Sequence, residues 1–169
     1  MSEVTMSETK NLVVERTYRA TVQELWELWT TKDGFESWWG PEGFRVEVQE
    51  IDARLGGTLR YDMIADAPEM VAAMKKMGQP LSHKTRGTFS QLDPHRGLTL
   101  THVIDFLPGV KPYESTIAME LFPSGGNVRM VVHLSAMHNA EMTRMQLEGF
   151  TSQIGKLDKR FGAAVSASA

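Results

Sequence analysis

The stretch that decides the fold lies near the end of the chain: residues 139–162, NAEMTRMQLEGFTSQIGKLDKRFG. Asn139 is a favourable helix N-cap. After it, apolar side chains recur every three or four residues, as on one face of a helix: Leu147, Phe150, Ile154, Leu157 and Phe161. This stretch is predicted to form one helix about 36 Å long at 1.5 Å per residue. Its apolar stripe must be buried against another element.

Most of the preceding chain alternates apolar and polar residues with the period of β-strands. Such runs are predicted at 11–20, 44–55, 58–64, 83–92, 97–105, 114–122 and 127–136. Short turns rich in Gly and Pro separate most of them, of which Gly56-Gly57 is a typical hairpin signal. Successive strands joined by short turns indicate an antiparallel meander of about six or seven strands.

Three shorter helical segments interrupt the strands. Thr21 and Glu24 form a capping box, which predicts a helix after the first strand. A second short helix is expected to hold Trp38 and Trp39 and to end at Gly40. Residues 66–80 break the strand rhythm and are predicted to be an inserted helix.

These elements predict an α+β domain over residues 11–161. A strongly twisted sheet of this size curls, and its curved face would wrap around the long C-terminal helix. A curled sheet that grips a helix leaves a space between the two, and that space is where a function is expected. The polar segment 1–10 and the small-residue segment 162–169 are expected to be disordered tails.

Composition narrows the function further. The 169-residue chain has a formal net charge of −3, which gives no electrostatic footprint for nucleic acid. It contains no cysteine, and no apolar run is long enough for a membrane span. The N-terminus does not resemble a signal peptide, so a cytoplasmic location is expected. No phosphate-binding loop or nucleophile motif is found, and no cofactor is predicted.

The five histidines are scattered without metal-ligand spacing, so no metal site is predicted. His102 stands out because it shares strand parity with Leu98, Leu100 and Ile104, which places it on the inward face. An imidazole in apolar surroundings needs a hydrogen-bond partner. That partner is a bound ligand, a water or another side chain, and in the last case His102 is an ordinary core histidine.

Several short motifs resemble one known family: Trp38-Trp39-Gly40-Pro41, Gly56-Gly57-Thr58, Gly149-Phe150 and Leu157. Their order is similar to that in the homologues of the activator of the ninety-kDa heat-shock protein ATPase, specifically its C-terminal domain. This family lies within the START-like, birch-allergen-like (SRPBCC) superfamily. The resemblance covers about residues 11–161 and implies a helix-grip fold with a cavity for hydrophobic ligands, lipids included. The family usually has Gly-Trp where this chain has Gly149-Phe150.

The expected function is therefore the binding of a small hydrophobic or amphipathic molecule in an internal cavity. Glycine within a helix costs about 0.8–1.0 kcal/mol relative to alanine, so Gly149 suggests a need for space. The expected cavity residues are Trp39, Tyr61, Met63, His102, Met119, Met130, Met145 and Gly149. The inserted helix is expected to act as a lid through Met70, Met74 and Met77.

Two alternatives stay open at this point. The first is a cyclase- or hydrolase-like enzyme that uses His102 with a carboxylate such as Glu148 or Glu120. The second, implied by the resemblance, is a chaperone-interacting module with a role in the stress response. The eukaryotic activator has a further N-terminal domain for which this chain has no room. A homodimer is neither favoured nor excluded by the sequence.

Overall fold

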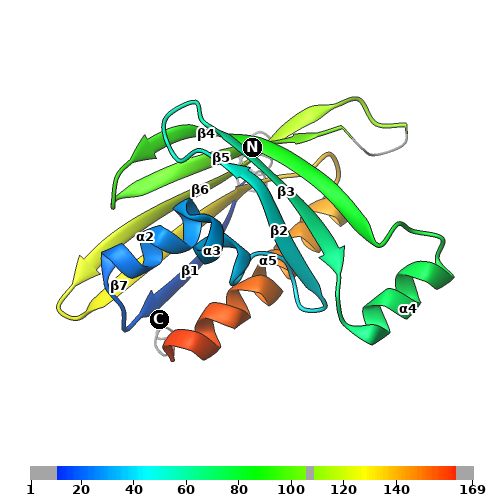
Figure 1. Cartoon of the computed structure of the whole chain (residues 1–169). Coiled ribbons are helices and arrows are strands. Elements are labelled where there is room, and N and C mark those ends of the chain that lie inside the picture. The colour runs from blue at the N-terminus through cyan, green and yellow to red at the C-terminus, as the bar shows by residue number, and fades with distance from the viewer. Residues whose placement is uncertain (1–10, 106–108, 163–169) are drawn as a thin grey trace, which may run out of the picture.

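The computed structural model describes residues 11–105 and 109–162, which form one seven-stranded antiparallel sheet with four helices (Figure 1). The strand order is β1-β7-β6-β5-β4-β3-β2. The strands are β1 Asn11–Tyr18, β2 Phe44–Ile51, β3 Thr58–Ala65, β4 Ser82–Asp93, β5 Gly97–Ile104, β6 Tyr113–Ser124 and β7 Asn127–Ser135. The helices are α2 Val22–Thr30, α3 Lys32–Glu36, α4 Pro68–Lys76 and α5 Ala140–Phe161. The predicted α+β helix-grip class is thus confirmed.

The second short helix was predicted to hold Trp38 and Trp39, and this is wrong: α3 ends at Glu36, and both tryptophans lie in the turn that follows. The starts of α2 and α5 have the expected chemical causes. The Thr21 hydroxyl accepts a hydrogen bond from the Glu24 amide (3.0 Å), and the Glu24 carboxylate accepts one from the Thr21 amide (2.9 Å). The Asn139 side chain caps α5 by accepting from the Met142 amide at 2.8 Å. Gly162 ends α5 in the left-handed conformation (φ 64°). Apart from Gly162, the segments 1–10 and 162–169, which were expected to be disordered tails, lie outside the described residues.

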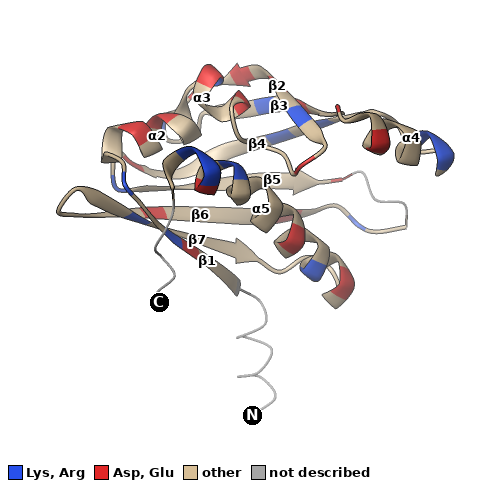
Figure 2. Cartoon of the chain, turned by 90° about the horizontal axis from the view of Figure 1, so that it is seen from below, with Lys and Arg blue, Asp and Glu red and all other residues tan. Residues whose placement is uncertain are grey.

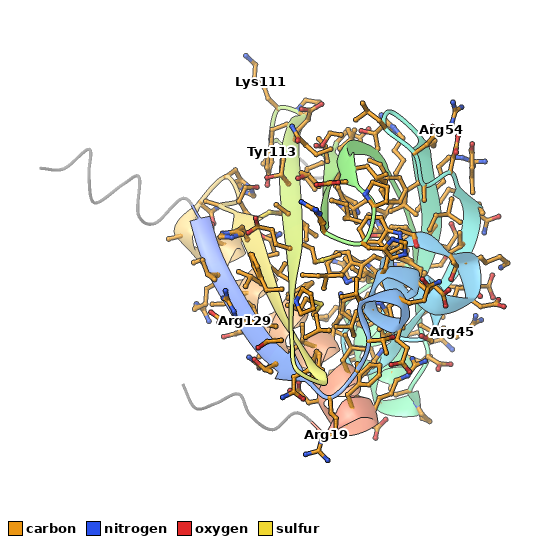
Figure 3. All side chains as sticks on the ribbon, turned by 90° about the vertical axis from the view of Figure 1, so that its left-hand side faces the viewer. Arg19, Arg45, Arg54, Lys111, Tyr113 and Arg129 are labelled. Carbon is orange, nitrogen blue, oxygen red and sulfur yellow. The ribbon has the colours of Figure 1, made fainter. Side chains whose placement is uncertain are left out.

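The sheet curves so that one face is concave and carries α2, α3 and α5 (Figures 1 and 2). Inward side chains are buried at alternate positions along the strands, as in β5, where Leu98, Leu100, His102 and Ile104 all point inward. The outer face carries mixed charges, and labelled basic side chains such as Arg45, Arg54 and Arg129 project away from the interior (Figure 3). None of the described helices is both long and apolar enough to cross a membrane.

The two ends of the concave face differ. At one end α2 covers the sheet, and Trp26 packs on His95 in the β4–β5 turn with ring centroids 5.6 Å apart. We call this the closed end. The other end is where β3 and β7 finish and where α5 starts (Figure 2). We call it the open end.

Helix α4 joins β3 to β4 at the open end and projects beyond the sheet (Figure 1). None of its residues is buried, and Met77, which follows it, is 64% exposed. Met70 of this helix lies next to Gly43 in the turn before β2. A Cβ atom added to Gly43 would lie 3.2 Å from the Met70 methyl group. The inserted helix predicted at 66–80 therefore exists, and its role as a lid stays a prediction.

The C-terminal half of α5 is fastened to the edge strand β1. The Tyr18 hydroxyl, on a fully buried side chain, donates to the Asp158 carboxylate at 2.8 Å, and Arg16 lies 3.3 Å from the same carboxylate. Burial, and then the bond to Asp158, raises the pKa of Tyr18 well above its ordinary value. Tyr18 therefore stays a neutral donor.

Tyr18→Phe is expected to lower the free energy of unfolding by about 2 kcal/mol, because a hydrogen bond to a charged group is lost and Asp158 keeps only Arg16. Urea denaturation measures the change. The control is Glu15→Gln, which lies on β1 like Tyr18. It removes an exposed ion pair to Arg129 on β7 and should cost about 0.5 kcal/mol or less. Equal losses in the two variants would contradict the proposed fastening.

Candidate functional site

A chain of hydrogen bonds crosses the concave face between a loop and two strands. The Trp39 indole N–H, after α3, donates to the Tyr61 hydroxyl in β3 at 3.1 Å. The same hydroxyl lies 3.0 Å from Nε2 of His102 in β5. All three side chains are buried, with exposed fractions of 3%, 3% and 6%. The structure thus brings together three residues that the sequence analysis placed in one cavity.

The protonation states within this chain follow from burial. The Tyr61 oxygen accepts from Trp39, and its hydroxyl also has Thr85 as a hydrogen-bond partner. Which atom donates between the Tyr61 hydroxyl and His102 Nε2 depends on the histidine tautomer. Burial raises the pKa of Tyr61 above its usual range. Burial also lowers the pKa of His102 to about 4. Both side chains are therefore neutral near pH 7, so this group of side chains forms hydrogen bonds but carries no charge.

The residue after Trp39 connects the same loop to α5. Gly40 adopts a left-handed conformation (φ 98°), and its amide donates to Oε1 of Gln153 at 2.8 Å. Two residues later the Glu42 amide donates to the Ser152 hydroxyl at 3.0 Å. The Trp39 side chain therefore bonds to the sheet, and the backbone amide of Gly40 bonds to α5.

The first half of α5 is much less buried than the second half. The buried side chains of the helix all lie from Phe150 onward, whereas residues 140–149 are exposed or only partly buried. At Gly149 an added Cβ would meet no atom within 4 Å. A close approach of the helix to the sheet therefore does not explain the glycine at position 149, because the position faces open space.

The other predicted cavity residues occupy different depths. Met119 and Met130 are 1% exposed and belong to the central apolar core. Met63 is partly buried and packs at the edge of that core, near the end of β3. Met145 is 50% exposed on the first half of α5. The lining of a cavity by this set stays a prediction.

The sequence analysis missed the polar side chains that α5 points inward. Gln153 is 4% exposed, and it lies on the apolar stripe between Phe150 and Leu157. Its Nε2 atom has no hydrogen-bond partner among the described residues, and neither does the buried Oε1 atom of Gln146, two turns earlier. The available signal was a glutamine within an apolar stripe, since polar residues are seldom fully buried.

The carboxylates considered for catalysis lie elsewhere. Glu120 is on the outer face of β6, where it pairs with His133, and its side chain is 54% exposed. Glu148 pairs with Arg144 on the solvent side of α5 and is 65% exposed. Neither reaches the concave face, so His102 has no carboxylate partner of the kind that the enzyme hypothesis required. Within the described ranges, no three His, Asp or Glu side chains gather closely enough to hold a metal ion.

Several surface depressions lie among the described residues, and two of them border residues of the expected cavity, Tyr61 in the first and Met119 in the second. One, of about 170 Å³, lies on the outer face of β3–β5, where Asp62 pairs with Lys84 and Asp105 with Arg86. The other, of about 810 Å³, borders the β4–β5 turn at the closed end. Neither includes His102, Ser115 or Gln153, the buried polar side chains of the described structure. We take the concave face as the candidate site because it holds the bonded group Trp39, Tyr61 and His102 and the unpartnered amide of Gln153.

Fold and site together define a helix-grip domain whose sheet and long helix are linked by a Trp-Gly turn. The family model described as "Activator of Hsp90 ATPase homolog 1-like protein" matches residues 19–162. The chain belongs to this family, as the resemblance predicted.

Solved structures show the same fold at low sequence identity. A Chromobacterium violaceum protein is 20% identical, with a TM-score of 0.74 over 90% of this chain and 96% of its own. The AHSA1 protein from Silicibacter pomeroyi is 22% identical, with a TM-score of 0.66 over 89% and 96%. An AHSA1-like protein from Aeromonas hydrophila is 14% identical, with a TM-score of 0.62 over 89% and 93%. No curated protein matches the chain.

The low pKa of His102 predicts how stability depends on pH. The unfolded chain binds a proton at this residue below its ordinary pKa of 6.5, whereas the folded protein resists protonation down to about 4. The free energy of unfolding should therefore be constant above pH 6.5 and fall by about 3 kcal/mol between pH 6.5 and 4 from this residue.

Urea denaturation at a series of pH values measures this dependence. His102→Gln keeps an acceptor for Tyr61 but cannot titrate, so its stability should fall less than that of the wild type in this window. His133→Gln, on the outer face, is the control and should follow the wild-type curve. A His102→Gln curve parallel to the wild type would contradict the assignment.

Proposed function

We propose that the chain binds a small hydrophobic or amphipathic molecule between the first half of α5 and the open end of the sheet. The observation that carries the proposal is the uneven burial of α5. An amphipathic helix that lies on a sheet normally buries its whole apolar stripe. Here the fully buried positions of the stripe begin at Phe150. Leu147, one turn earlier, is only partly buried against the core, and Gly149 faces open space. A molecule that fills this space would complete the core.

The chemistry of the surrounding side chains favours an apolar guest of variable shape. The inner wall is aromatic: Trp39 stacks on Phe35 with centroids 4.5 Å apart and contacts Phe150 at 6.1 Å. Methionines complete the proposed lining at Met63, Met119, Met130 and Met145. Flexible thioether side chains adapt to ligands of different shape. Tyr61 and His102 bond to each other, as expected of a core histidine, so this wall offers a ligand few free polar groups.

Helix α4 is proposed to cover the route into this space. Helix α4 lies at the open end of the sheet, where α5 also starts (Figure 2). Met70 and Met74 are partly buried, whereas the polar side of the helix carries Lys75 and Lys76. A helix without buried side chains is held weakly and can move at little cost in free energy.

The proposal is tested with N-phenyl-1-naphthylamine, a neutral dye whose fluorescence rises in apolar surroundings. The wild type should bind it saturably, with a dissociation constant in the micromolar range. Gly149→Phe should weaken binding at least tenfold, because the new ring occupies the proposed site.

The matched control is Gly155→Phe. Gly155 also has no atom within 4 Å of an added Cβ, but it lies about 120° around the helix from Gly149. This variant should bind the dye like the wild type. The absence of saturable binding in the wild type, or equal loss in both variants, would overturn the proposed site.

Membership of the family brings a second candidate function, binding to a chaperone of the ninety-kDa heat-shock class. Such binding would use an outer surface of this domain and would not need the space beside Gly149. Calorimetric titration with the purified chaperone tests it. Binding that survives in Gly149→Phe would show the chaperone surface to be separate from the proposed ligand site.

A further inference from the structure

One buried donor in the proposed site lacks a partner. Gln153 is 4% exposed, and its Nε2 atom makes no hydrogen bond to any described residue. A buried amide N–H without an acceptor costs roughly 1–3 kcal/mol. Such groups are therefore rare in folded proteins unless something else satisfies them.

The orientation of this amide is fixed by the loop. Gly40 N–H donates to Oε1 of Gln153 at 2.8 Å, so a flip of the carboxamide would set two donors against each other. Nε2 is thus held as a donor. The Trp29 indole also lacks a partner, but it packs edge-on against Trp38 and Trp39, whose ring faces are weak acceptors. Gln153 is the stronger indication of a missing acceptor.

The position of Gln153 connects it with the open space. Residues 146, 149 and 153 are spaced by three and four, which places them along one stripe of α5. Gly149 in the middle faces open space, and the buried Oε1 of Gln146 also lacks a described partner. The Gly40 bond places the carboxamide beside the turn that carries Trp39.

Charge at this place restricts the guest. The buried polar side chains of the described residues are His102, Ser115 and Gln153, and His102 is neutral near pH 7. Lys156 follows Gln153 on the same helix, and its Nζ lies 3.5 Å from the Phe44 carbonyl oxygen. Lys156 also interacts with the carboxylates of Glu42 and Asp66. A buried carboxylate without its own cation is strongly disfavoured.

We infer that the molecule bound beside α5 is uncharged and carries an oxygen acceptor, a carbonyl or hydroxyl, that accepts a hydrogen bond from Gln153 Nε2. This inference rests on the proposed binding function and narrows its ligand class. An ionised fatty acid or another carboxylate does not fit.

Three probes of one shape test the inference in competition with the dye: 2-acetylnaphthalene, 2-isopropylnaphthalene and 2-naphthoate. At pH 7.5 the wild type should bind the ketone at least tenfold more tightly than the carboxylate. The affinity of the ketone relative to the hydrocarbon should fall about tenfold when the Gln153 donor is removed.

Two substitutions remove that donor. Gln153→Met deletes the whole amide, and Gln153→Leu does the same with a branched apolar side chain, so it remains informative if the first variant does not fold. The control Ser152→Ala removes the second bond between the same turn and α5, the one from Glu42 N–H, and leaves Gln153 intact. It should leave the ratio of ketone to hydrocarbon affinity unchanged.

The outcomes separate the two proposals. A ratio that falls in the Gln153 variants and not in Ser152→Ala supports the inference. An unchanged ratio, or equal binding of ketone and carboxylate, overturns it and means that Gln153 meets only water, while the binding function stands. If neither the dye nor any naphthalene binds the wild type, the proposed function itself fails.

Discussion

The structure depends on one dipeptide that joins the sheet to the long helix. The Trp39 side chain reaches Tyr61, which reaches His102, so a single indole N–H engages β3 and, through the tyrosine, β5. The Gly40 amide reaches Gln153 on α5. Only glycine adopts the left-handed conformation of position 40 without strain. Together these contacts fix the distance between the sheet and the C-terminal half of the helix.

This link divides the concave face into two regions. On one side, Tyr18 and Asp158 add a second attachment, and α2 closes the sheet. On the other side, the described structure holds α5 through its Asn139 cap and the neighbouring loop, and no side chain of residues 140–149 is buried. A domain of this size packs its core tightly by default. Residues 140–149 carry no buried side chain, although Leu147 packs against the core, and this is the region where we propose that a ligand binds.

The sequence predicted the fold well because its signals are local. The Thr21–Glu24 capping box, the strand alternation around His102 and the apolar stripe of α5 each correspond to an observed element. The contacts within the candidate site were harder to predict from the sequence. Parity placed His102 on the inner face, yet no sequence rule pairs it with Tyr61 across β4. The orphaned amide of Gln153 depends on the Gly40 contact, which joins residues 113 positions apart. The exposure of Met145 depends on how α5 leaves the sheet.

The most direct test is a methyl NMR spectrum of the protein with ε-¹³C-labelled methionine, recorded with and without N-phenyl-1-naphthylamine. Several methionines belong to the proposed lining, so their methyl groups report where a ligand binds. The account predicts dye-dependent shifts at Met63 and Met145, with smaller changes at Met119, which is buried in the core. Shifts confined to Met77, or a spectrum that the dye leaves unchanged, would contradict it.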